Sequence, residues 1–199
     1  MILYRPVGLN ELQLIYESGM RAFPPRLPEQ PIFYPVLNYA YAVQIARDWN
    51  TKSNTLAGYV TEFTVDGAYA AQFDRKIVGT RSHEELWVPA DQLDTFNRHI
   101  QNRILVTSAY FGAEFPGHIP SQGHLQGRDV VTQLEILATL LEQSPAALYN
   151  EIQINHTTLF LHFPFWKTYA TSTRHNSVLE AIEKLWSEMF SDVMLSQIT

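Results

Sequence analysis

Three polar or aromatic side chains near the ends of short apolar strands are of types that could do chemistry: Arg5, Tyr34 and Glu85. A guanidinium can hold hydroxyls or phosphates through its planar fork of donors, and an aromatic ring can stack on a flat ligand. A carboxylate can stabilise positive charge where it develops in a transition state. Glu85 follows Glu84 on one predicted strand, so alternation sends one of the two inward and the other outward. We take Glu85 as the inward carboxylate.

Each of these residues also has a purely structural interpretation. Arg5 can be a surface or paired arginine at a strand end, and Tyr34 and Tyr41 can be core or rim aromatics. If Glu84 is the inward carboxylate, or if both glutamates meet solvent, there is no site on this strand. Three other arginines are expected to be solvated: Arg21, Arg26 and Arg47.

The elements that must position these side chains begin with a short strand over residues 2–5. In the helix that follows, Asn10 is expected to be the N-cap, Gln13 to complete the capping box and Gly19 to end the helix in a left-handed conformation. Residues 21–31 contain four prolines, which exclude regular structure and predict a rigid extended loop.

Further strands and helices follow this loop. Residues 32–36 predict a strand, and Asn38 is expected to cap a second helix. Its inner face has the i, i+3, i+4, i+7 spacing and consists of Ala42, Ile45, Ala46 and Trp49. Alternating residues predict a half-buried strand over 58–65. The later elements are a strand over 84–88, a short helix over 90–98 and a strand over 103–111. This order of elements indicates an α+β fold.

The glycine- and proline-rich residues 112–127 predict a linker or a long loop. We therefore expect a core over residues 1–111 and a separate C-terminal unit over 128–199. That unit is predicted to be αββα, with a helix over 128–142, a hairpin within 152–162 that turns at 155–156, and a final helix over 177–190. The apolar face of the last helix suits docking on the first part or self-association as a homodimer.

Composition excludes several classes of protein. Hydrophobic residues make up 46% and charged residues 17%, which excludes disorder and favours a compact globule. A net charge of −6 argues against binding to nucleic acid or to anionic lipid. The chain has no cysteine, and its histidines lack the spacing of a zinc site, so we expect no metal. With no long apolar run and no basic, apolar leader, a cytoplasmic protein is expected.

Three segments, taken in order, resemble the ADP-ribosyltransferase superfamily, in particular its arginine-first branch that includes pertussis-like toxins. Leu3-Tyr4-Arg5, with a helix that ends in glycine, is similar to the opening strand and helix of that family. Gly58-Tyr59-Val60 and the alternating residues after it look like its central strand. Glu84-Glu85-Leu86-Trp87-Val88-Pro89 is similar to its catalytic-glutamate strand. The resemblance covers residues 2–107, about half of the chain.

The resemblance implies an ADP-ribosyltransferase-like core of mixed sheets with flanking helices, and NAD as a substrate. Breaking the bond between nicotinamide and ribose develops oxocarbenium charge on the ribose. A carboxylate that hydrogen-bonds a ribose hydroxyl stabilises this charge, and the resemblance gives that role to Glu85. It implies that Arg5 binds NAD and that Tyr34 stacks near nicotinamide. His83, two residues before the glutamate, stands where the family usually has an acidic residue or glutamine and is a further candidate for binding NAD.

The chain departs from the family on the second strand. The toxin branch carries a Ser-Thr-Ser motif there that supports the glutamate, whereas this chain has Phe33-Tyr34-Pro35-Val36-Leu37. This difference and His83 point either to an acceptor other than arginine or to a lost reaction. One interpretation is an enzyme that transfers ADP-ribose to a protein or small-molecule acceptor, and the other is a catalytically inactive binding or interaction module. An RNA phosphotransferase is disfavoured because it needs several basic residues around phosphate.

Overall fold

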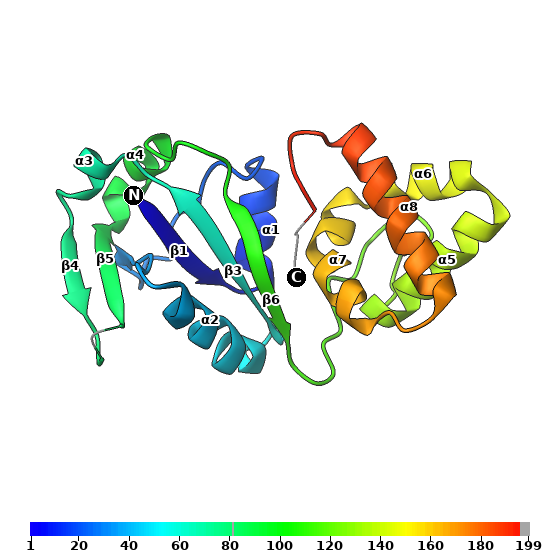
Figure 1. Cartoon of the computed structure of the whole chain (residues 1–199), viewed down its shortest axis with the longest axis horizontal. Coiled ribbons are helices and arrows are strands. Elements are labelled where there is room, and N and C mark those ends of the chain that lie inside the picture. Colours follow the sequence, from blue (N-terminus) through cyan, green and yellow to red (C-terminus); the bar gives the residue numbers. More distant parts are fainter. Residues whose placement is uncertain (81, 196–199) are drawn as a thin grey trace. The chain divides into compact units, whose positions relative to one another are not determined.

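The computed structural model describes residues 1–80 and 82–195 and has an α+β fold. The chain divides into two compact units, Met1–Tyr110 and Phe111–Thr199, which Figure 1 shows as a strand-containing part and a helical part. Its described residues include two three-stranded antiparallel sheets, both built from strands that begin in the first unit, and eight α-helices. The α+β fold class predicted from the order of elements is thus confirmed.

The first sheet has β3 (Ala57–Thr64) between β1 (Ile2–Val7) and β6 (Leu105–Phe111). The second has β5 (Glu84–Pro89) between β2 (Ile32–Phe33) and β4 (Asp74–Ile77). Strands β1 and β3 pair antiparallel, in a register that sets Arg5 opposite Thr61. The hydroxyl of Thr61 donates to the carbonyl oxygen of Arg5 at 2.8 Å, which adds a side-chain bond to this register.

A single residue, Val36, connects the two sheets. Its amide donates to the carbonyl oxygen of Tyr4 at 2.7 Å, and its carbonyl accepts from the amide of Tyr4 at 2.9 Å. On its other side Val36 forms a β-bridge to Glu85. The strand that carries Arg5 and the strand that carries Glu85 therefore lie on either side of one residue.

The first helix is α1 (Leu9–Glu17), and its beginning differs from the prediction. Gly8, in an extended conformation, is the N-cap and no side chain caps the helix, so the expected cap at Asn10 is wrong. Gln13 does not complete a capping box but donates to Glu17 one turn later, at 2.9 Å. The end is as predicted, because Gly19 has a left-handed φ of 72°.

Helix α2 (Tyr39–Asp48) packs against β1 and β3, as Figure 1 shows. The side chain of Asn38 accepts from the amide of Tyr41, which confirms it as the cap. Ala42 and Ala46 are fully buried, as predicted, but Trp49 is 58% exposed, so its assignment to the inner face is wrong. The small alanine side chains let the helix lie close to the sheet.

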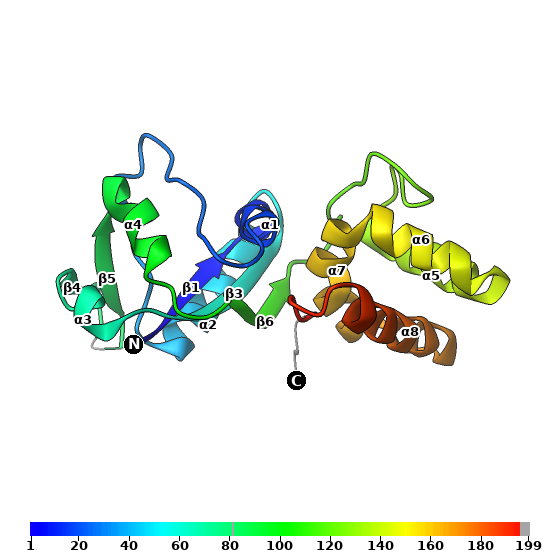
Figure 2. The same ribbon diagram turned by 90° about the horizontal axis from the view of Figure 1, so that it is seen from above.

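The proline-rich segment after α1 is irregular, as predicted, and Figure 2 shows it as a long loop. Its Phe23 is 2% exposed and packs against Phe33 and Phe63. The side chain of Asn97, in α4 (Leu93–Arg98), holds both the amide and the carbonyl of Phe23, at 3.0 and 2.9 Å. The loop is thus fixed at this point. A short helix, α3 (Gly67–Ala70), completes the α-helices of this unit, and short 3-10 helices cover Asn50–Lys52 and Ala90–Gln92.

The second unit is helical in its described part, so the predicted αββα arrangement is wrong. Its helices are α5 (Val130–Gln143), α6 (Pro145–Ile154), α7 (His156–Tyr169) and α8 (Thr173–Met189). The segment expected to be a hairpin forms the end of α6 and the first half of α7. Helix α7 is buried on nearly all sides, and a short apolar run such as residues 159–161 does not distinguish a buried helix from a strand.

The loop before α5 belongs to this unit and is attached to α6 through a buried carboxylate. Glu151 accepts from the amides of His124 and Leu125 at 3.0 and 3.1 Å, and from the side chain of Asn155 at 2.7 Å. Burial raises the pKa of Glu151, but these hydrogen bonds outweigh burial and lower it overall. A side chain at Gly123 would meet this carboxylate, since a Cβ there would lie 2.6 Å from its oxygen.

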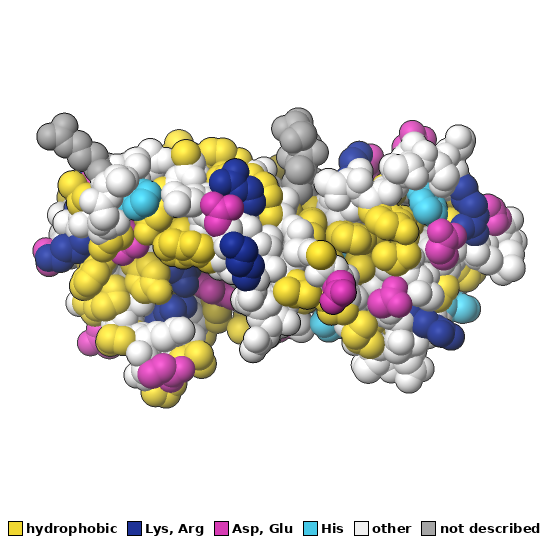
Figure 3. All heavy atoms as spheres, turned by 90° about the horizontal axis from the view of Figure 1, so that it is seen from below, with side chains coloured by type: hydrophobic (Ala, Val, Ile, Leu, Met, Phe, Trp, Pro, Cys, Tyr) yellow, Lys and Arg dark blue, Asp and Glu magenta, His cyan; other side chains and the backbone are white. Residues whose placement is uncertain are grey.

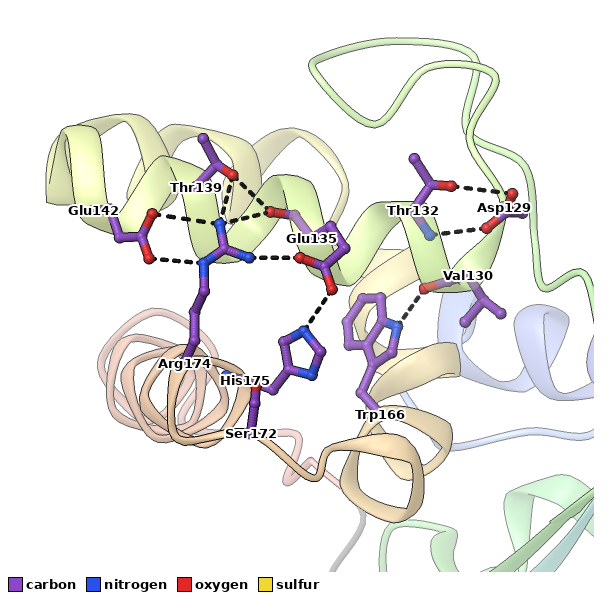
Figure 4. A network of polar contacts seen from close by, with 10 residues as sticks. All are labelled: Asp129, Val130, Thr132, Glu135, Thr139, Glu142, Trp166, Ser172, Arg174 and His175. Carbon is purple, nitrogen blue, oxygen red and sulfur yellow. Dashed lines mark hydrogen bonds and ion pairs between the residues drawn. The ribbon is translucent and has the colours of Figure 1, made fainter.

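On its exposed surface, helix α8 is attached to α5 by an ion-pair network (Figure 4). Arg174 donates to Glu135 at 2.5 Å and to Glu142 at 2.7 Å, and the ring of His175 contacts the other oxygen of Glu135 at 2.7 Å. Ser172 caps α8, accepting from the amide of His175. These contacts link the start of the last helix to the middle and the C-terminal end of α5.

A second buried polar cluster surrounds His162 of α7, which is fully buried. One ring nitrogen accepts from the amide of His118 at 2.7 Å, and the other contacts Oε1 of Gln133 at 2.8 Å. The amide nitrogen of Gln133 donates to the carbonyls of His118 and Arg128, so its oxygen accepts from the imidazole. The ring is therefore held neutral, with its proton on Nδ1. Burial, together with His118, lowers the pKa of His162 to about 3.

This buried imidazole predicts a pH-dependent stability for the second unit. The folded pKa of His162 lies below its ordinary value of 6.5, so its contribution is complete above pH 6.5 and is lost as the pH falls towards 3. Between pH 7 and pH 5 the loss amounts to about 2 kcal/mol. We expect urea unfolding of the whole chain to show this loss, and His162→Gln, which keeps an acceptor for the amide of His118, to reduce it. If the free energy of unfolding of the variant falls with pH as steeply as that of the wild-type chain, His162 is not the group responsible.

Candidate functional site

A cavity of about 620 Å³ lies in the first unit, within the size range of small-molecule sites. Arg5 of β1, Glu85 of β5 and Tyr34, which follows β2, all line it. Tyr41 contributes from the first turn of α2, and the proline-rich loop after α1 forms part of the wall. The structure thus brings together three of the four residues that the sequence singled out. It does so through the Val36 bridges between the sheets.

Arg5 is 6% exposed and is held from several sides. Its Nε donates to Oε1 of Glu11 at 3.3 Å, and its Nη1 donates to the carbonyl oxygen of Tyr34 at 3.4 Å. The guanidinium carbon lies 5.2 Å from the ring centre of Phe33 and 5.1 Å from that of Tyr34. These contacts fix the plane of the guanidinium and leave donors of its fork for a ligand.

Glu85 points into the first unit and is 8% exposed. Its two oxygens accept from the Tyr41 hydroxyl at 3.2 Å and from the Trp87 indole nitrogen at 3.0 Å. Burial and the negative charge of Glu85 raise the pKa of Tyr41 to about 12, so its hydroxyl keeps the proton that it donates. The adjacent Glu84 has a side chain that is 34% exposed and lies 3.8 Å from Arg75. Alternation on β5 thus separates the two glutamates as the strand geometry requires.

Of the remaining two predicted site residues, Tyr34 lines the cavity and His83 lies outside it. The ring of Tyr34 is 40% exposed and lies beside the Arg5 guanidinium at the cavity. His83 does not line the cavity. It stacks on Tyr41, with ring centres 4.1 Å apart and planes 12° apart, and its Nδ1 contacts the carbonyl of Val78 at 3.2 Å. His83 therefore lies behind the tyrosine that contacts Glu85, and it can position that tyrosine.

Sequence reasoning missed the two side chains that hold the glutamate. Trp87 lies two residues after Glu85 on the same strand, so alternation places both on one face and could have indicated the contact. Tyr41 comes from a helix 44 residues earlier in the chain, and only the folded structure brings it to the carboxylate. In this chain a phenol and an indole hold the two oxygens of the carboxylate.

Arg26, expected in solvent, is a cavity residue whose side chain is 7% exposed. Its Nη1 lies 3.7 Å from Oε1 of Glu11, the same oxygen that pairs with Arg5. Its Nε is buried and has no hydrogen-bond partner among the residues that the structure describes. Burial and the charge of Arg5 lower the pKa of Arg26. The expectation holds for Arg47, whose side chain is 56% exposed.

Other kinds of site find less support. Within residues 1–80 and 82–195, no group of three or more histidine, aspartate or glutamate side chains could hold a metal ion. In the same ranges, no helix combines the length and apolar character needed to cross a membrane. On the face drawn in Figure 3, acidic and basic side chains are interspersed among hydrophobic ones. The cavity of the first unit therefore carries the functional argument.

Comparisons with protein-family models, with curated proteins and with solved structures found no match. The function has to be inferred from the cavity and from the side chains that line it.

Proposed function

We propose that the first unit is an ADP-ribosyltransferase-like enzyme that binds NAD in this cavity and transfers ADP-ribose to an acceptor. The observation that carries the proposal is that the Arg5 guanidinium and the Glu85 carboxylate line one cavity, with Tyr34 beside the guanidinium. The order of the strands and helices in this unit, with two sheets joined at Val36, supports the proposal, whereas the mixed sheets that the resemblance implies are antiparallel in this chain.

In the proposed reaction the bond between nicotinamide and C1′ of the ribose breaks. Nicotinamide leaves with the electron pair as a neutral molecule, and positive charge develops on the ribose. Glu85 accepts a hydrogen bond from a ribose hydroxyl and stabilises this charge as it forms. A nucleophile of the acceptor then bonds to C1′ and releases its proton. A carboxylate has about four acceptor positions, so the bonds from Tyr41 and Trp87 leave Glu85 free to accept another.

One observation favours the alternative of a catalytically inactive binding module. The second strand, where the toxin branch carries hydroxyls that support the glutamate, offers Phe33, the Tyr34 ring and Pro35. Against it, Tyr41 and Trp87 hold both oxygens of Glu85, so the carboxylate is oriented without those hydroxyls. The two functions differ in one measurable respect, because only the enzyme releases nicotinamide.

The proposal is tested by adding NAD to the purified chain. Titration calorimetry measures binding, and chromatography measures nicotinamide released over time. We expect both a binding heat and a steady release of nicotinamide. Binding without release would favour the inactive module, and the absence of both would overturn the proposal.

Arg5→Lys is expected to weaken NAD binding by about tenfold or more. Lysine keeps the positive charge beside Glu11 but loses the planar fork and the packing of the guanidinium beside Tyr34. Calorimetry with NAD measures the change. Arg47→Lys is the matched control, because Arg47 is exposed and pairs with the neighbouring Asp48. Equal affinities of the wild-type chain and the Arg5 variant would remove Arg5 from the binding site.

A further inference from the structure

One face of helix α2 runs along the cavity. Tyr41, Ile45 and Trp49 are spaced i, i+4, i+8, and all three line it. Trp49 still follows helical geometry, because its amide donates to the carbonyl of Ile45 at 3.1 Å. A helix rises about 1.5 Å per residue, so Trp49 lies about 12 Å further along the axis than Tyr41. The cavity therefore has one end at Tyr41 and Glu85 and another at Trp49.

Trp49 lies at the end of α2 and faces the cavity. It is 58% exposed, which is unusually high for a tryptophan. Large aromatic residues are normally well buried, because they carry a large apolar surface. Trp49 thus presents a free indole surface beside a hollow. Stacking of a nucleic-acid base on an aromatic side chain contributes about 1–3 kcal/mol.

The wall of the cavity formed by β1, α1 and the proline-rich loop has an excess of positive charge. Arg5 and Arg26 both pair with a single oxygen of Glu11, at 3.3 and 3.7 Å. The other carboxylate of the cavity, Glu85, accepts from Tyr41 and Trp87 and pairs with neither arginine. The side chain of Arg26 is more than nine-tenths buried, yet its Nε has no partner among the described residues. A buried donor without a partner is costly, and an anion at this wall would compensate the excess charge.

We propose that the cavity has a built subsite for an adenine nucleotide, in which Trp49 stacks on the base and Arg26, together with Arg5, binds the phosphates. This deepens the proposed function, on which the placing of nicotinamide at the Glu85 end rests. The binding of ADP alone does not depend on the reaction. The subsite accounts for the exposed indole and for the second buried arginine.

The test uses the full chain and two probes, ADP and inorganic pyrophosphate, in titration calorimetry. We expect Trp49→Ala to weaken ADP binding by about tenfold or more, which corresponds to the loss of one stacked base. The same variant should bind pyrophosphate as the wild-type chain does, because pyrophosphate has no base. Trp49→Phe keeps an aromatic face and should restore most of the ADP affinity.

Arg26→Gln should weaken binding of both probes, whereas Arg47→Gln, on the exposed side of α2, should weaken neither. Failure of the subsite and failure of the reaction give different results. If the wild-type chain binds ADP through Trp49 but releases no nicotinamide from NAD, the subsite stands and the reaction does not. If NAD is cleaved and Trp49→Ala leaves both ADP affinity and the KM for NAD unchanged, the subsite is overturned. Absence of ADP binding to the wild-type chain overturns it as well.

Discussion

Glu85→Gln is expected to lower the rate of nicotinamide release from NAD by about 100-fold or more. Glutamine has the same shape but no charge, so it cannot stabilise the positive ribose of the transition state. One of its terminal atoms is also a donor, which faces either the Tyr41 hydroxyl or the Trp87 indole nitrogen, both of which donate to Glu85. NAD affinity should change little, because the charge on the ribose is absent before the bond breaks.

Glu84→Gln is the control for this substitution. It makes the same chemical change one residue earlier, on a side chain that is partly exposed and lies near Arg75. We expect its rate to stay within about twofold of wild type, since exposed ion pairs contribute little. The measurement is nicotinamide release at saturating NAD for each of the three proteins. A Glu85→Gln variant that keeps a tenth or more of the wild-type rate would show that this carboxylate is not catalytic.

Gly58→Ala is expected to destabilise the first unit by about 3 kcal/mol and to abolish NAD binding. A Cβ at Gly58 would lie 2.0 Å from the carbonyl oxygen of Ala46 and 2.7 Å from its carbonyl carbon. Both are backbone atoms of α2, so no side chain can move aside to make room. The helix itself would have to shift away from β3, and it carries Tyr41 and Trp49 at the cavity.

Gly67→Ala provides the comparison, because a Cβ at that position meets no atom within 4 Å. It should unfold at the same denaturant concentration as the wild-type chain. Urea unfolding and NAD calorimetry of the two variants measure both consequences. Wild-type stability of Gly58→Ala would mean that α2 and β3 are less closely packed than described here.

Local signals predicted much of the first unit. Asn38 caps α2 through its short polar side chain, and Gly19 ends α1 through its left-handed backbone. Both effects act within one helical turn, so the local sequence is enough to predict them. The prolines of residues 21–31 correctly excluded regular structure. The prediction of Asn10 as the N-cap of α1 was wrong, because the extended backbone of Gly8 lets the helix begin earlier. The sequence alone did not distinguish these two starting points.

In the second unit, the hairpin predicted from the pattern of apolar residues was wrong. The predicted hairpin was placed on residues 152–162, where Gln153, Asn155 and two threonines interrupt short apolar runs, and so short a segment does not distinguish a strand from a buried helix. In the structure, most of this segment packs against α5 and α8 as helix α7. Pro164 lies within this helix, although a proline normally argues against a helix at its position in a sequence.

For the site, sequence reasoning found Arg5, Tyr34 and Glu85 but missed contributions from the proline-rich loop and from the end of α2. Arg5 and Glu85 stand on strands whose order could be guessed, and both line the cavity. Arg26 was assigned to solvent because a loop arginine is usually exposed. Trp49 was assigned to the core because its helical spacing matches that of the buried Ala42 and Ala46. Only the three-dimensional position of the cavity separates an indole that faces it from one that faces the sheet.

The double role of Val36 has a consequence for how this unit can vary. Main-chain bonds hold the spacing between the guanidinium strand and the carboxylate strand: Val36 pairs with Tyr4, and its neighbours Pro35 and Leu37 bond to Leu86 and Glu84. Substitutions here are tolerated where they keep the segment extended and the residue at position 36 apolar, because Val36 is fully buried. The backbone frame that separates the two charged groups thus needs no hydroxyl side chain on this segment.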